Sequence, residues 1–150
     1  MRYKINIMGG SGAGCPKEKE LKKAVRETLR LEGVGDSVEL SILLMDDKKI
    51  GRLNRRYLNR SGPTDVISFG VAGNGPVIRK LKGYIGDIAI STDTARRNAG
   101  LFGTTKKSEI LLYAVHGTLH LLGYDDGIKK GKQAMDRKQD KVMERICRGN

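Results

Sequence analysis

The chain has 150 residues, enough for one domain with a hydrophobic core. Its formal net charge of +12 fits either a nucleic-acid partner or solvated helix surfaces. Aromatic residues make up only 5% of the sequence, which excludes base stacking as the main mode of recognition. No apolar run approaches the roughly 20 residues that span a bilayer, and Cys15 and Cys147 are too few for a disulfide framework. We therefore expect a cytoplasmic protein that does not bind a membrane.

The first third of the chain predicts a strand, a flexible connection and a helix. Apolar and polar residues alternate over Arg2–Met8, as they do in a strand. The Gly-rich stretch Gly9–Gly14 has neither the ending of a phosphate-binding loop nor the spacing of a dinucleotide site, so we expect no organic cofactor. An amphipathic helix is predicted over Lys17–Arg30, and Gly33 ends it.

Strands dominate the middle of the sequence and helices the end. The middle predicts a central strand at Val38–Met45 and a helix at Asp46–Tyr57, followed by a loop at Gly62-Pro63. It then predicts a strand at Val66–Val71, a turn at Gly73–Gly75 and a last strand at Tyr84–Ile90. Helices are predicted over Thr92–Leu101, Thr105–Leu122 and Ile128–Cys147. This order favours an α+β fold, a single domain over residues 1–150 with a mixed β-sheet backed by helices.

One predicted helix carries the only two histidines of the chain. Ile110–Leu122 is apolar on almost every side, so we expect it to be the buried central helix. His116 and His120 lie four residues apart on it, and residues at this spacing share a helix face. The same spacing is the one that metal-binding helices use, so the helix is predicted to bind a metal.

A carboxylate follows where a third metal ligand is expected. Gly123 ends the helix, and Asp126 arrives ten residues after His116, giving the pattern H-x3-H-x2-G-x2-D. Metzincin proteases share this layout, but Gly117 replaces their general-base glutamate and Asp126 replaces their third histidine. Carboxylate is an ordinary zinc ligand, and three protein ligands leave a fourth position open for catalysis. Asp125 is the competing carboxylate, but the ten-residue offset favours Asp126.

The alternative interpretation gives these residues no metal. Two core histidines would then hydrogen-bond to the backbone, and Asp126 would cap the following helix. Because two histidines at ligand spacing precede a carboxylate, we predict one zinc ion per chain, held by His116, His120 and Asp126.

Three sequence blocks resemble the YbeY family of bacterial endoribonucleases. His116–Asp126 (HGTLHLLGYDD) is similar to the family signature H-G-x-L-H-L-x-G-Y-D-H and departs from it only at the last position. Leu53–Phe69 resembles the family's L-N-x-x-Y-R-x-x-D-x-P-T-D-V-L-S-F block, and Tyr84–Ser91 its L-G-D-I-x-I-S strand. The resemblance implies a single-domain α+β fold, zinc in a cleft, and cleavage of ribosomal RNA. The implied roles are maturation of the 3′ end of 16S rRNA and ribosome quality control, with the small ribosomal subunit as partner.

The second block departs from the family pattern at two positions. Leu58 stands where the family usually has an arginine important for activity, and Ser61 stands where it has aspartate. Arg60 or Arg56 is the candidate to supply the missing cation, although loop arginines are commonly solvated.

Three matched polar residues also have a purely structural interpretation. Thr64 and Asp65 precede a strand, where side chains of this kind commonly form turns. Asp87 lies within a predicted strand, either facing the surface or supporting a metal-ligating histidine. Asp87 and Arg60 are therefore the weak catalytic candidates.

Three functions are compatible with these features. A metal-dependent endoribonuclease comes first. A metallopeptidase is demoted because Gly117 offers no general base. A non-catalytic ribosome-assembly factor, whose metal only stabilises the turn, stays open because Leu58 and Asp126 depart from the family pattern.

Overall fold

A computed structural model describes residues 3–10, 12–35, 37–70 and 82–148. The strands are β1 (Lys4–Met8), β2 (Val38–Met45), β3 (Val66–Gly70) and β4 (Gly83–Ser91). The helices are α1 (Glu18–Leu31), α2 (Asp47–Leu58), α3 (Thr92–Phe102), α4 (Lys106–Leu121) and α5 (Lys129–Arg148). Each predicted element is present to within two residues where it is described. The turn predicted at Gly73–Gly75, like the ends of two predicted strands at Arg2 and Val71, lies outside the described residues.

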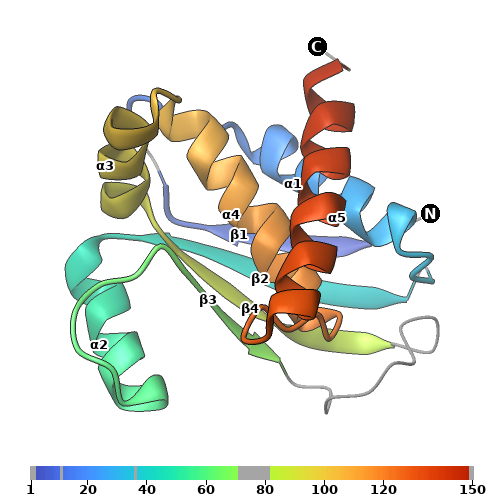
Figure 1. The fold of residues 1–150 in the computed structure, drawn as a ribbon, viewed down its shortest axis with the longest axis horizontal. Coiled ribbons are helices and arrows are strands. Elements are labelled where there is room, and N and C mark those ends of the chain that lie inside the picture. The colour runs from blue at the N-terminus through green and yellow to red at the C-terminus, as the bar shows by residue number, and fades with distance from the viewer. Residues whose placement is uncertain (1–2, 11, 36, 71–81, 149–150) are drawn as a thin grey trace.

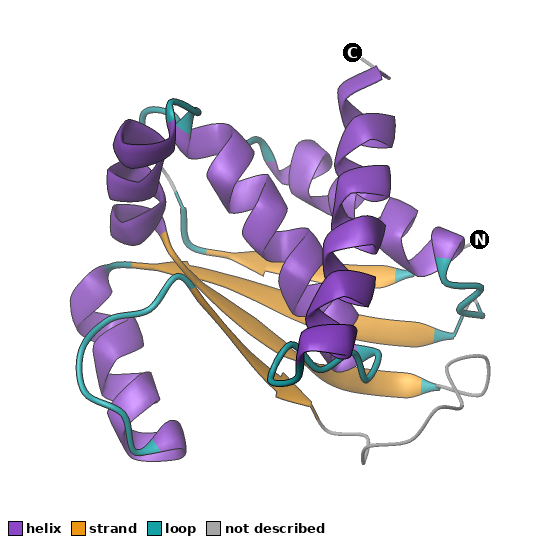
Figure 2. Cartoon of the chain, in the orientation of Figure 1, coloured by secondary structure: helices purple, strands orange, loops and turns teal. Residues whose placement is uncertain are grey.

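The four strands form one mixed sheet in the order β1-β2-β4-β3. β1, β2 and β4 run parallel, whereas β3 pairs antiparallel with β4 at the edge. The interior position of β2 fits its apolar sequence, as expected. Helices α1, α4 and α5 lie over one face of the sheet, and α2 lies on the other side at one end (Figure 1). The predicted α+β fold, a mixed sheet backed by helices, is confirmed (Figure 2).

The core is formed where α1 and α4 pack on the parallel strands. The amphipathic face of α1 buries Leu21, Val25 and Leu29 completely, in one cluster with residues of β1, β2, β4 and α4. Gly33 ends this helix region with a φ of +71°, a conformation that favours glycine. A second cluster joins α1, α4 and α5 through residues such as Val115, which is fully buried. The C-terminal helix is therefore part of the hydrophobic core.

Helix α2 packs less completely. Asp46 caps its start by accepting a hydrogen bond from the Lys49 backbone at 2.8 Å, and Asn59 ends it in the left-handed conformation. Ile50 is its only fully buried apolar residue, packed on Ile67 and Ala89 of the sheet. The rest of its surface is mostly exposed and polar. None of the helices in the described residues has the length and apolar character needed to cross a membrane.

Candidate metal centre

Helix α4 carries both histidines, and its burial and its capped start fix the backbone from which their side chains project. Thr105 and Ser108 cap its start reciprocally, with the Thr105 hydroxyl accepting from the Ser108 backbone at 3.1 Å. One turn separates His116 from His120, and their Nε2 atoms lie 3.0 Å apart. Their side chains are 23% and 28% exposed, so both rings are partly accessible although most of the helix is buried.

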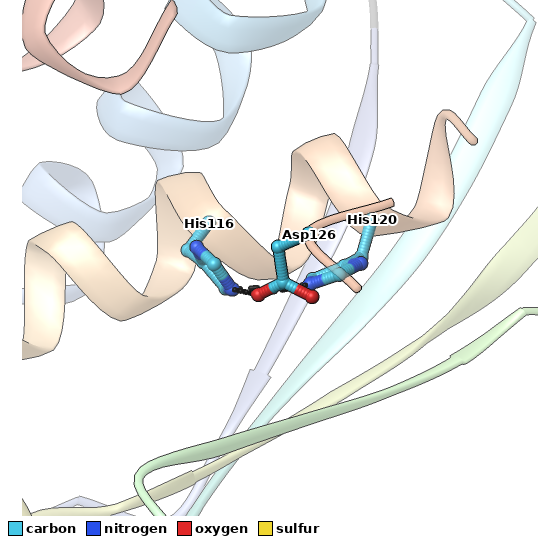
Figure 3. A group of neighbouring side chains, drawn as sticks. All are labelled: His116, His120 and Asp126. Carbon is cyan, nitrogen blue, oxygen red and sulfur yellow. Dashed lines mark hydrogen bonds and ion pairs between the residues drawn. The ribbon is translucent and has the colours of Figure 1, made fainter. Parts of the chain in front are cut away.

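The loop after α4 brings a carboxylate to the two rings. Gly123 turns the chain with a φ of +101°, a value that favours glycine. The Asp126 Oδ2 atom then lies 3.4 Å from His116 Nε2 and 3.5 Å from His120 Nε2, between the two imidazoles (Figure 3). The Asp125 carboxylate instead accepts a hydrogen bond from the Gly127 backbone at 2.8 Å. Asp126 and not Asp125 therefore joins the histidines.

The three atoms have the spacing that a tetrahedral ion needs. Zinc–nitrogen and zinc–oxygen bonds of roughly 2.0–2.1 Å place neighbouring tetrahedral ligands about 3.3 Å apart. The observed separations of 3.0, 3.4 and 3.5 Å bracket this value. In the part of the chain that the structure describes, no other group of His, Cys, Asp and Glu meets in this way. The group can hold a metal ion.

Gly117 explains why this helix lacks the protease glutamate. A Cβ atom at this position would lie 2.5 Å from Cγ2 of Ile88 and 3.1 Å from Oγ of Ser68. The Ser68 hydroxyl also donates to the Gly117 carbonyl at 3.0 Å, joining α4 to β3. The position where metzincins carry their general base therefore packs against the sheet and has no room for a side chain.

The ligand loop is anchored to α1 and α5 through Tyr124, two residues before Asp126. The Tyr124 hydroxyl donates to Glu32, which also pairs with the Lys138 ammonium at 3.2 Å. Burial and the hydrogen bond to the Glu32 carboxylate raise the pKa of Tyr124 to about 12. These long-range contacts hold the loop in place, and no spacing rule in the sequence identifies them.

A second unexpected contact reaches His116 from α5. The side-chain oxygen of Gln139 lies within hydrogen-bond distance of His116 Nδ1. The sequence signature ends at Asp126, thirteen residues earlier, so nothing in it indicates Gln139. The amphipathic pattern of α5 is the one indication of this contact in the sequence, because it predicts which face of the helix is buried.

Asp87, one of the two catalytic candidates, lies apart from this group. A β-bulge beside Leu40 and Gly86 puts Asp87 on the same side of the sheet as Tyr84, whose hydroxyl donates to its carboxylate. The next residue, Ile88, faces Gly117 of α4, so Asp87 points to the opposite face. Gln139, not Asp87, contacts a histidine of the group.

The other matched residues lie at the end of α2 and in the loop after it. Arg60 is exposed just after the cap of α2, and Leu58 is 46% exposed. Asp65 accepts hydrogen bonds from the Val66 backbone at 2.8 Å and the Thr64 hydroxyl at 3.3 Å. These local hydrogen bonds agree with the turn-forming interpretation of Thr64 and Asp65.

Comparisons with known proteins agree with this geometry. A family model described as Endoribonuclease YbeY matches residues 15–147. Relatives named Endoribonuclease YbeY include one from Pelotomaculum thermopropionicum, 39% identical over 84% of each chain. Another, from Bacillus subtilis, is 34% identical over 84% of this chain and 83% of its own. The solution structure of TM1509 from Thermotoga maritima has a TM-score of 0.65 at 29% identity, covering 95% of this chain and 88% of its own. The chain therefore belongs to the YbeY family of endoribonucleases.

Proposed function

We propose that this protein is a zinc-dependent endoribonuclease that cuts single-stranded RNA in the cytoplasm, with residues 1–150 acting as a single catalytic domain. Its proposed substrate is ribosomal RNA, at the 3′ end of the 16S molecule, and its proposed context is ribosome quality control on the small subunit. The observation that carries the proposal is the convergence of His116, His120 and Asp126 in a chain of this family.

In this proposal His116 Nε2, His120 Nε2 and Asp126 Oδ2 hold the ion. Zinc held by these residues would supply a Lewis acid for a phosphate oxygen and would lower the pKa of a bound water. Two imidazoles and one carboxylate form a donor set that transition metals accept. The protein contributes the orientation of these three side chains.

The exposure of the ligands favours catalysis over a purely structural ion. The Asp126 side chain is 43% exposed, and both histidines are more than one-fifth exposed. Structural zinc sites are closed by four protein ligands, whereas catalytic sites keep one position free for substrate. Only three such ligands converge among the residues described. This is the observation that demotes the assembly-factor alternative.

The charge of α2 supports an RNA partner. Five exposed cations lie along this helix: Lys48, Lys49, Arg52, Arg55 and Arg56. Within the described ranges none of the five makes an ion pair, and Asp47 of the same helix pairs with Arg97 of α3. Cations left uncompensated on one element bind phosphates and release counterions.

A metal-controlled nuclease assay tests the function. The protein is stripped with a chelator, reloaded with zinc, and incubated with a single-stranded rRNA fragment and separately with peptides. We expect slow RNA cleavage only in the reloaded sample, and no peptide hydrolysis. The His116→Ala/His120→Ala variant is the matched control, because cleavage that survives in it comes from a contaminant. Peptide hydrolysis with intact RNA would establish the metallopeptidase instead.

The products of the same assay distinguish two chemical routes. A 2′,3′-cyclic phosphate means that the 2′-hydroxyl of RNA attacked the phosphate. A linear phosphate formed without a cyclic intermediate means that water attacked.

Affinity for the RNA should fall steeply with salt, and a flat response would exclude binding through the phosphate backbone.

A further inference from the structure

We infer that Gln139 is a positioning residue that orients His116 and fixes which of its ring nitrogens faces the metal group. The inference rests on the proposed metal site and adds a residue from α5 to it. The contact is direct, because the Gln139 Oε1 atom and His116 Nδ1 lie within hydrogen-bond distance.

The chemistry of the contact selects one form of the ring. An amide oxygen can only accept a hydrogen bond, so His116 Nδ1 must carry the proton. A neutral imidazole has one N–H group, which leaves Nε2 with a free lone pair. Nε2 is also the atom that lies 3.0 Å from the His120 ring and 3.4 Å from the Asp126 carboxylate. The hydrogen bond with Gln139 therefore stabilises the tautomer of His116 whose Nε2 lone pair is free to bind a metal.

Packing on both sides holds Gln139 in place. Met135, four residues before it, is fully buried, and Val142, three residues after it, is 2% exposed. Both belong to the cluster that joins α5 to Val115 and Leu119 of α4. Residues at these spacings lie on the same helix face, so Gln139 lies in the middle of the α4–α5 contact. A side chain held there loses little further freedom when it orients His116.

The two histidines differ in this respect. In the described ranges, Nδ1 of His116 has a protein acceptor, whereas the hydrogen bonds of His120 involve its Nε2 atom and the metal group. Outer partners that orient a ligating histidine typically change metal affinity about 10- to 100-fold when removed. Loss of Gln139 should therefore weaken the site without abolishing it.

Zinc affinity in three variants tests this role. The dissociation constant for zinc is measured by competition with a chromogenic chelator, a readout independent of activity. Gln139→Leu should raise it about 10- to 100-fold. Gln139→Glu keeps an acceptor at the same place and should restore affinity close to wild type. Gln133→Leu makes the same change at an exposed position of the same helix and should leave zinc affinity unchanged.

The ring itself gives a second readout. At about pH 8, where an ordinary histidine is neutral, ¹⁵N chemical shifts of metal-free protein should show His116 protonated at Nδ1. Gln139→Leu should convert this single form into a mixture, even if the variant stays fully folded. Zinc affinity in Gln139→Leu equal to wild type would overturn the positioning role while leaving the metal site standing. Absence of zinc binding in the wild type would overturn the metal site itself.

Discussion

Two polar clusters of this molecule are each built around an aspartate and serve different purposes. At the joint between α2 and α3, the Asp47 carboxylate accepts hydrogen bonds from Ser91 and Thr94, both at 2.7 Å, and from Arg97 at 2.5 Å. In the group at the end of α4, by contrast, two imidazole nitrogens and a carboxylate oxygen converge. One cluster surrounds its acceptor with donors, and the other points acceptors at one another.

The difference teaches how to separate a structural joint from an ion site. With the proton of His116 on Nδ1, its Nε2 and the Asp126 carboxylate are both acceptors. Only His120 can supply a hydrogen between them, so the group lacks donors unless a cation enters. The balance of donors and acceptors distinguishes the two clusters, even though both contain an aspartate.

The largest effect should come from removing both rings. His116→Ala/His120→Ala should lose both bound zinc and RNA cleavage. Its loss of zinc affinity should exceed the roughly 10- to 100-fold expected when a residue that only orients a ligand is removed. Added zinc should raise the unfolding temperature of the wild type but not that of the variant, because only the wild type binds the ion. Elemental analysis and thermal unfolding monitored by circular dichroism check both statements. Full metal content in the variant would place the ion elsewhere.

Two changes at Asp126 should act in opposite directions. Asp126→Ala removes one of three ligands and should weaken zinc binding at least about 10-fold. This is no smaller than the effect expected from removing a residue that only orients a ligand. Asp126→His should keep or tighten binding, since imidazole is a good ligand for the same ions. Chelator competition measures both. Equal affinity in the alanine variant and the wild type would exclude Asp126 from the site.

The Asp47 joint should show the reverse behaviour. Asp47→Asn removes the charge that three donors surround and should lower the free energy of unfolding by about 1–3 kcal/mol. Zinc content should stay at the wild-type value, since the joint contributes no ligand. Urea unfolding and elemental analysis separate the two readouts, with Asp136→Asn, an exposed aspartate of α5, as the control. Loss of zinc in Asp47→Asn would break the distinction between the clusters.

The smallest effect is a dependence on pH. Burial alone would raise the pKa of Asp47, but hydrogen bonds from Arg97, Ser91 and Thr94 outweigh it and lower the pKa to about 2. The unfolded chain, with an ordinary aspartate pKa of 3.8, then binds more protons than the folded protein between these values. The stability due to Asp47 is present above about pH 4 and is lost as pH falls toward 2. The difference between wild type and Asp47→Asn should therefore shrink over this range, and a constant difference would contradict it.

Local patterns predicted much of this molecule. The strands and helices follow from periodicity and capping residues, and the approach of Asp126 to the histidines follows from an i, i+4 pair and one glycine turn. These features depend on residues close in sequence, whose geometry a single helix and turn determine. The fold class followed from the order of the same elements.

Long-range contacts were beyond prediction from one sequence. Gln139 meets His116 only because α5 packs against α4, and Tyr124 meets Glu32 across 92 residues of chain. The place of Asp87 depends on a bulge in β4, which shifts the side-chain alternation after Tyr84. Without the bulge, Tyr84 and Asp87 would lie on opposite faces of the sheet.

The position of the ligand loop between α4 and α5 couples ion binding to the C-terminal helix. An ion held by both histidines and Asp126 joins the end of α4 to the segment that begins α5, and Gln139 adds a bond from α5 itself. By mass action, ion present at 100 times its dissociation constant adds about 2.7 kcal/mol to the stability of the state that binds it. That energy should appear as slower amide hydrogen exchange in α5 when zinc is added. The metal-free protein should then open first at its C-terminal end.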